Sequence, residues 1–219
     1  MGRSHCTPDV EFAAFLRGVN VGRRTLRTAE WAATFSDFRV ANVGAAGTFA
    51  ISGAPSEARL RRELLAAAPF PTEAVLLARS DLQALLRAPA FGGPSSHGGR
   101  RSVTFLAATP RAVPALPMTR PTGGPWEVRL FEFRSPAVFG EHRRFRPDRI
   151  LYPNEVVERE FGVPATTRWW ETVEQVEAAF ASAPEPTRRP ARRPGRTGSP
   201  APAPRGPARS GRRTGSRTG

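Results

Sequence analysis

Apolar and polar positions follow two different periods along the first part of the chain. Over residues 10–16 the side chains alternate between two faces (VEFAAFL), and this period of two predicts a strand. Trp31, Phe35 and Phe38 then fall four and three positions apart, so they share one helical face. This spacing predicts a helix over residues 28–38 whose aromatic stripe packs in the core.

The following segments have the pattern of a hairpin, a second helix and another strand. Residues 39–43 and 48–52 are two short candidate strands joined by Gly-Ala-Ala-Gly, whose glycines can adopt the positive φ of a tight reversal. Pro55 is expected to open a helix with a leucine face, because proline is favoured at the first helical position. The VLLA run within residues 73–79 predicts a buried strand.

The resulting order of strand, helix, strand, strand, helix, strand is the βαββαβ arrangement of the ferredoxin-like superfold. Beyond a loop rich in glycine, proline and serine, residues 102–107, 126–133 and 137–142 are predicted strands, and residues 110–125 form a proline-punctuated connector. Capping residues predict the starts of three more helices, at Ser80–Gln83, Asn154 and Thr172–Gln175.

These elements predict an α+β fold built of two subdomains. The first is expected to be ferredoxin-like (βαββαβ) and the second a related α+β unit, followed by a disordered C-terminal tail. The expected parts are a flexible N-terminus (1–9), the ferredoxin-like subdomain (10–91), a linker loop (92–100), the second subdomain (101–184) and the tail (185–219).

Charge is concentrated in the predicted tail. The formal net charge is +14; residues 185–219 hold ten Arg and one Glu, or +9, which leaves 14 − 9 = +5 for the rest. The tail has no aliphatic or aromatic side chain larger than alanine, so it cannot offset the entropy of ordering. Its arginines are expected to attract nucleic acid nonspecifically and with strong salt dependence, or the tail is an extension without a dedicated role.

The residue inventory excludes several chemistries. All 33 basic residues are arginine, so Schiff-base lysines and P-loop lysines are absent, and the single Cys6 permits neither an intramolecular disulfide nor a thiolate zinc cluster. Three scattered histidines predict no metal centre, and nothing indicates a cofactor. No catalytic signature is found. His97, in the glycine-rich loop, is the only histidine that could be considered as a catalytic acid or base, and the alternative is that it is a solvated loop residue without such a role.

The start of the chain is polar and the apolar runs span only a few residues. Neither a signal peptide nor a membrane-spanning segment is therefore expected, and the sequence predicts a cytoplasmic protein with no membrane partner.

Three motifs resemble those of a known family. Residues 14–22 (AFLRGVNVG), 103–106 (VTFL) and 165–173 (ATTRWWETV) are similar to AFLRGINVGG, VTFL and ATTRNWNTV of the bacterial family catalogued as domain of unknown function 1697. The resemblance implies a cytosolic protein with a two-part α+β fold related to the ferredoxin-like type, and it implies no established reaction. Departures from the family pattern include Trp169 and Glu171, which stand where asparagines are usual.

The first candidate site follows the first predicted strand. Arg17, Gly18, Asn20 and Gly22 combine a charged fork, two flexible glycines and an amide, which could expose backbone N–H groups to an anion. The structural alternative is that Arg17 pairs with a carboxylate while the glycines meet turn geometry.

The second candidate site precedes the predicted last helix. Thr166, Thr167 and Arg168 offer two hydroxyls and a guanidinium where a helix start would attract negative charge, although neighbouring glutamates could satisfy the same groups. Trp169 and Trp170 follow, and we expect one to be buried and the other half exposed, where it could stack on a base or a partner.

Two function hypotheses of different classes result. The first is a binding module for an anionic ligand or nucleic acid near Arg17 and Arg168, with a tail that adds nonspecific nucleic-acid affinity. The alternative is an enzyme that acts on a small phosphorylated or carboxylated metabolite in the cleft between the subdomains, with the two arginines as substrate clamps.

Overall fold

The computed structural model describes residues 10–20, 25–35, 37–54, 56–91, 95, 98–144 and 150–182. All of them belong to the first of two compact units, residues 1–188 and 189–219. The predicted flexible N-terminus and disordered tail lie outside the described residues, as do Gly22, His97 and most of the predicted linker loop.

The alternating segment at the start of the chain forms a central strand of an antiparallel sheet. Strand β1 (Val10–Leu16) pairs with β3 (Thr48–Ala54) on one side and with β4 (Ala74–Ala78) on the other, and β2 (Arg39–Asn42) adds to β3. The order is β2-β3-β1-β4. The predicted hairpin is present between β2 and β3, where both Gly44 and Gly47 have positive φ.

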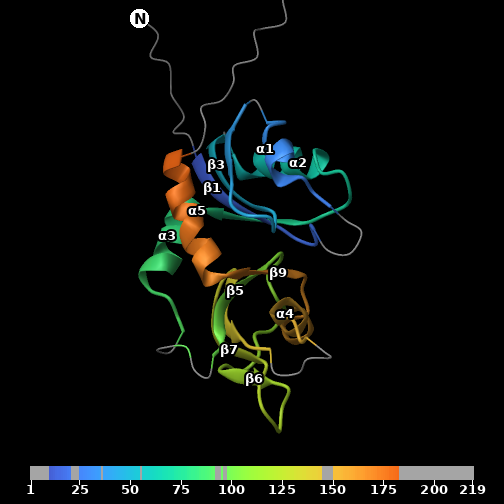
Figure 1. The fold of residues 1–219 in the computed structure, drawn as a ribbon, viewed down its shortest axis with the longest axis vertical. Helices are drawn as coiled ribbons and strands as arrows, with labels where there is room; N and C mark the ends of the chain where they lie inside the picture. Colours follow the sequence, from blue (N-terminus) through green and yellow to red (C-terminus); the bar gives the residue numbers. More distant parts are fainter. Residues whose placement is uncertain are drawn as a thin grey trace, which may run out of the picture. The chain divides into compact units, whose positions relative to one another are not determined.

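Helices cover both faces of this first sheet (Figure 1). Helices α1 (Thr28–Ala32) and α2 (Glu57–Ala66) pack against one face, and α3 (Arg79–Arg87) and α5 (Trp170–Ser182) pack against the other. Both faces of β1 are therefore buried, with Phe12, Ala14 and Leu16 in one hydrophobic cluster and Ala13 and Phe15 in a second.

A second antiparallel sheet has the order β6-β7-β8-β5-β9. Its strands are β5 (Arg100–Leu106), β6 (Met118–Arg120), β7 (Val128–Arg134), β8 (Ala137–His142) and β9 (Ala165–Trp169). Helix α4 (Pro153–Phe161) packs Val156, Val157 and Phe161 into a cluster with apolar residues of this sheet. Two antiparallel sheets with helices packed on them confirm the predicted α+β fold.

The two sheets share one core. Phe15 of β1 and Phe105 of β5 stack with ring centroids 4.1 Å apart and an angle of 12° between the rings. Helix α5 follows β9 without an intervening loop, and it carries Val173, Val176 and Phe180 into the cluster that contains Phe15 and Phe105. The last strand of the second sheet thus leads directly into a helix that covers the first sheet.

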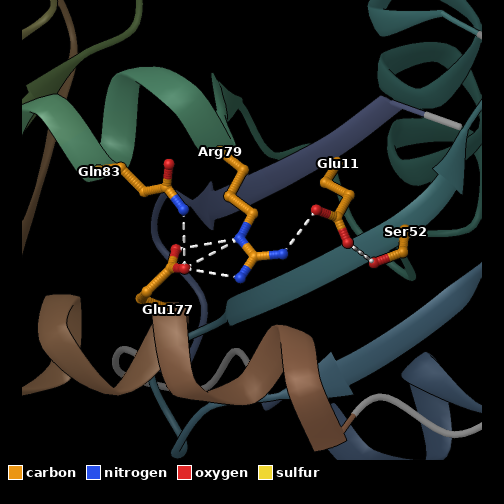
Figure 2. A network of polar contacts seen from close by, with 5 residues as sticks. All are labelled: Glu11, Ser52, Arg79, Gln83 and Glu177. Carbon is orange, nitrogen blue, oxygen red and sulfur yellow. Dashed lines mark hydrogen bonds and ion pairs between the residues drawn. The ribbon is translucent and has the colours of Figure 1, made fainter. Parts of the chain in front are cut away.

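A polar network fastens α5 to α3 and to the first sheet (Figure 2). Arg79 donates hydrogen bonds to Glu177 of α5 (Nη2–Oε1 2.7 Å) and to Glu11 of β1 (Nη1–Oε2 2.7 Å). Gln83 donates to Glu177 at 3.0 Å, and Ser52 of β3 donates to Glu11 at 3.0 Å. The contacts hold the pKa of Arg79 above its ordinary value, chiefly through the hydrogen bond to Glu177.

Several predicted helix boundaries are wrong. Helix α1 ends at Ala32, whereas the sequence predicted that it would continue to Phe38. Just after Ala32 the hydroxyl of Thr34 donates a hydrogen bond to the carbonyl of Trp31, and such side-chain bonds compete with the helix. Tertiary packing nevertheless keeps the aromatic stripe together, with the Trp31 and Phe35 centroids 4.8 Å apart.

The capping residues chosen from the sequence are also not the ones used. Helix α3 begins at Arg79 directly after β4, so Ser80 lies inside the helix, and α5 begins at Trp170, so Thr172 does as well. In α4 the capping residue is Tyr152, and Asn154 follows Pro153, a residue favoured at a helix start. Strands β6 and β9 were not predicted. No helix in the described ranges is long and apolar enough to cross a membrane.

Candidate functional site

Arg168 is a buried cation in strand β9, with 6% of its surface exposed. Its neighbour Thr166 points the same way, while Thr167 alternates to the other side and bonds the Thr104 hydroxyl at 2.8 Å. These residues lie in a strand paired with β5 rather than in a turn before a helix. Their side chains, and not a helix N-terminus, therefore determine what the segment can bind.

The guanidinium of Arg168 joins three separate segments of the chain. Its five N–H groups all have protein oxygen acceptors, on the end of β1, on the β2–β3 turn with the first residue of β3, and on β9 itself. Nε donates to Thr48 Oγ1 at 2.6 Å. Nη1 donates to Thr166 Oγ1 at 2.7 Å and to the carbonyl of Thr167 at 2.8 Å. Nη2 donates to the carbonyls of Leu16 (2.7 Å), Ala46 (2.7 Å) and Gly47 (3.2 Å).

These acceptors are all neutral oxygens. Burial lowers the pKa of Arg168 to about 10, and no carboxylate raises it again. The side chain therefore stays protonated at neutral pH, and its positive charge has no acidic partner among the described contacts. A buried charge without a counter-ion is costly, so this part of the protein favours the approach of an anion.

Arg17, at the end of β1, is only partly buried and is already paired. Its Nη2 lies 2.8 Å from Glu158 Oε1, and its Nη1 lies 3.6 Å from Glu73 Oε2. The same Glu158 oxygen also accepts the backbone N–H of Ala165 at 2.9 Å. The structural alternative for Arg17, a carboxylate pair, is thus present.

The turn after Arg17 is held by Asn20. Gly18 and Asn20 both have positive φ, 66° and 56°. The Asn20 amide donates to the carbonyl of Ala45, and its Oδ1 accepts the backbone N–H of Leu26 at 2.7 Å. Asn20 therefore connects this turn to the β2–β3 turn, which is also the turn that Arg168 contacts.

The two predicted segments border one cavity. This space, called the Arg17 cavity below, has a volume of about 660 Å³. Arg17 and Arg168 both line it, so the convergence that the binding hypothesis requires is present. The lining consists of residues 16–20, Ala45, Ala46, Asn154 and residues 165–168.

A second cavity lies beside the first and has a more apolar lining. Its volume is about 380 Å³, and it is called the Trp169 cavity below. The two cavities share four lining residues: Ala46, Asn154, Thr167 and Arg168. The remaining lining residues are His142, Arg144, Ile150, Tyr152, Pro153, Trp169 and Thr172.

The tryptophan pair divides as expected. Trp170 is 8% exposed and packs in the shared core, with its ring 5.0 Å from that of Phe91. Trp169 is half-buried, and the Arg100 guanidinium lies 4.3 Å from its ring centroid. Trp169 is therefore the tryptophan that a ligand in the cavity would meet.

His142 and Tyr152 are site residues that the sequence analysis did not identify. Burial lowers the pKa of His142, outweighing the opposite effects of Glu127 and of a backbone contact at Leu151, so the imidazole is neutral at pH 7. Its Nε2 is buried and has no hydrogen-bond partner within the described part of the chain. The position of His142 at the end of a strand gave no signal of the cavity, because the cavity walls come from distant segments.

Among the described residues, no cluster of three or more His, Cys, Asp or Glu side chains could hold a metal ion. The chemistry available in the two cavities is thus that of three guanidinium groups, amides, hydroxyls, aromatic rings and one neutral imidazole.

Comparisons with known proteins show what the fold is similar to. The structure resembles that of a conserved bacterial protein, SP0830 from Streptococcus pneumoniae, with a TM-score of 0.54 and 18% sequence identity over 78% of this chain and 99% of that chain. No family model matches this sequence, and no curated protein does. At this identity the likeness shows the fold alone.

Proposed function

We propose that this protein binds an anionic ligand in the Arg17 cavity. The observation that carries the proposal is Arg168, a buried guanidinium whose described partners are all neutral oxygens. An anion in the adjoining cavity supplies the missing counter-charge, and in a partly desolvated site this attraction is much stronger than in water.

Arg168 acts on the ligand through its electric field rather than by direct contact. Its N–H groups are all donated to the protein, so the direct donors come from elsewhere in the lining. Arg17 is a partly exposed guanidinium on the same cavity, and the side-chain amide of Asn154 belongs to the same lining. Asn154 also lies in the first turn of α4, where the helix dipole favours negative charge.

The test is to put a carboxylate where the ligand charge would lie. Asn154→Asp keeps the side-chain shape and adds a negative charge beside Arg168, so inorganic phosphate should bind at least ~10-fold more weakly, as a loss of about 1.4 kcal/mol would give. The same substitution should raise the melting temperature, because it provides the counter-ion that Arg168 lacks.

The matched control is Gln175→Glu, which makes the same chemical change on the exposed side of α5, away from both cavities. Calorimetric titration at low ionic strength measures phosphate affinity, and a thermal melt measures stability. Equal phosphate affinity in wild type, Asn154→Asp and Gln175→Glu would contradict the proposal, as would a wild type that binds no phosphate.

We further infer that the chain belongs to the family catalogued as domain of unknown function 1697. The inference rests on the three motifs, and their placement supports it. The first motif provides residues 16–20 and the last provides residues 165–169 to the walls of the two cavities, while the middle motif lies in β5, which pairs with β9. Two of the segments that carry the resemblance thus border one site, and the third pairs with one of them.

An enzyme acting on a small anionic metabolite is the second candidate function. The observation that favours it is His142, a neutral imidazole that lines the Trp169 cavity. Its Nε2 is buried, so proton transfer from a bound substrate would require the side chain to turn into the cavity.

Nonspecific nucleic-acid binding by the tail stays a prediction, since residues 185–219 lie outside the described part of the chain. Fluorescence anisotropy of a labelled oligonucleotide, measured with full-length protein from low to physiological salt, would test it. Affinity that survives physiological salt would contradict a purely electrostatic tail.

A further inference from the structure

The Trp169 cavity adjoins the proposed anion site and differs from it in chemistry. It has an indole, a phenol ring and a neutral imidazole in its walls, together with apolar side chains such as Ile150 and Pro153 and the guanidinium groups of Arg144 and Arg168. Tyr152 is 50% exposed and Trp169 is half-buried, so both rings have surface left to cover. Aromatic rings with guanidinium groups beside them suit a flat aromatic group.

From this arrangement we propose that the ligand is an aromatic ring joined to a phosphate group. The phosphate occupies the Arg17 cavity and the ring occupies the Trp169 cavity. The inference rests on the proposed anion site and adds the substrate class: a nucleoside monophosphate, in which a sugar joins the ring to the phosphate, or an aryl phosphate.

The shared wall is what joins the two halves of the ligand. Ala46, Asn154, Thr167 and Arg168 face both spaces, so a group bound in one space is next to the other. Volumes of about 660 and 380 Å³ each fall in the range of small-molecule sites, which is roughly 300–1,000 Å³. Because the two spaces adjoin at these residues, we infer that one ligand extends from one space into the other.

His142 lines the Trp169 cavity with its neutral imidazole, whose ring centroid lies 5.8 Å from that of Trp169. Its Nε2 is buried and therefore out of reach of a ligand, so the imidazole adds aromatic surface rather than a hydrogen bond. The titrations below decide between a nucleotide and an aryl phosphate.

Stacking on Trp169 should dominate the contribution of the ring. Base–aromatic stacking typically changes affinity by roughly tenfold or more when the aromatic side chain is removed. In wild type, adenosine monophosphate should therefore bind at least roughly tenfold more tightly than inorganic phosphate. Trp169→Leu should reduce its affinity to that of phosphate and leave phosphate binding unchanged.

Calorimetric titrations of the full-length protein with inorganic phosphate, adenosine, adenosine monophosphate and 1-naphthyl phosphate test the proposal. Trp169→Phe, which retains an aromatic face, should keep most of the preference for the nucleotide. Tyr152→Ala offers a second removal of ring surface at an exposed position, and melting curves confirm that each variant is folded.

The outcomes separate the two proposals. If phosphate and adenosine monophosphate bind equally to wild type, or if Trp169→Leu and Tyr152→Ala leave the nucleotide preference intact, the ring site is refuted and the anion site stands. If neither compound binds, the anion site itself fails. Tighter binding of adenosine monophosphate than of 1-naphthyl phosphate identifies the nucleotide, and equal binding identifies a general aryl phosphate site.

Discussion

Replacing Arg168 with methionine is expected to destabilise the protein even though it removes a buried charge. Methionine has a similar length and no polar atom, so the substitution deletes the hydrogen bonds and keeps much of the packing. The residue lies in β9, but its acceptors lie on the end of β1 and on the β2–β3 turn as well. Both sheets therefore lose a connection.

The magnitude follows from two opposing effects. Burial lowers the pKa of Arg168 from its ordinary value to about 10, which corresponds to a cost of about 3 kcal/mol for keeping the charge inside. Against this, three backbone carbonyls accept from the guanidinium at 2.7–2.8 Å, and hydrogen bonds to a charged group contribute about 1.5–3 kcal/mol each. We expect a net loss of about 2–6 kcal/mol in the free energy of unfolding.

Urea denaturation at neutral pH, followed by far-ultraviolet circular dichroism, measures this loss. Arg168→Lys should lose nearly as much, because a single ammonium cannot reach acceptors on three segments. Arg62→Met, on an exposed face of α2, is the control and should change the free energy of unfolding by less than about 0.5 kcal/mol. A stability of Arg168→Met within about 1 kcal/mol of wild type would refute the argument that these hydrogen bonds outweigh the cost of the charge.

Two other predictions concern the β2–β3 turn and the network that holds α5. Gly47→Ala should lower the free energy of unfolding by about 2–4 kcal/mol, because φ is +70° and the new Cβ would collide with Val19. Gly44→Ala, at φ +71° with open space around it, should cost only about 1 kcal/mol. Equal losses in urea denaturation would contradict this prediction. Glu177→Gln should cost about 1–3 kcal/mol at pH 7 and weaken the acid sensitivity of the protein. Burial alone would raise the Glu177 pKa, but hydrogen bonds from Arg79 and Gln83 bring it below its ordinary value. The stability that the Glu177 carboxylate contributes is therefore complete above its unfolded pKa, near 4.5, and is lost as pH falls through its folded pKa. If the melting temperature falls equally from pH 7 to pH 3 in wild type and Glu177→Gln, this role is disproved.

The first sheet could be predicted because each of its elements has a local signal. The period-two run of β1 and the two glycines of the hairpin are each signals that span only a few residues. Strand β9 has no such signal: its sequence, Ala-Thr-Thr-Arg-Trp, leads directly into a helix, and β5 provides its pairing from about 60 or more positions away. Tertiary pairing therefore determined what local propensity did not.

The candidate site was predicted in part. Arg17 and Arg168 were identified from their motifs, but their approach depends on contacts between residues about 150 positions apart, such as Arg168 with Leu16. The sequence could not show that Arg168 would be buried among carbonyl groups or that Glu158 would pair with Arg17. His142 and Tyr152 were missed because only the folded chain places them beside Trp169.

The direct passage from β9 into α5 has a consequence for synthesis on the ribosome. One face of the first sheet, which includes Ala13 and Phe15, is covered by Val173, Val176 and Phe180 of a helix made near the end of the described chain. At translation rates of about 5–20 residues per second, the strands of this sheet emerge several seconds before that cover exists. During this interval the nascent chain exposes an apolar surface, and a chaperone or the ribosome itself would have to shield it from aggregation.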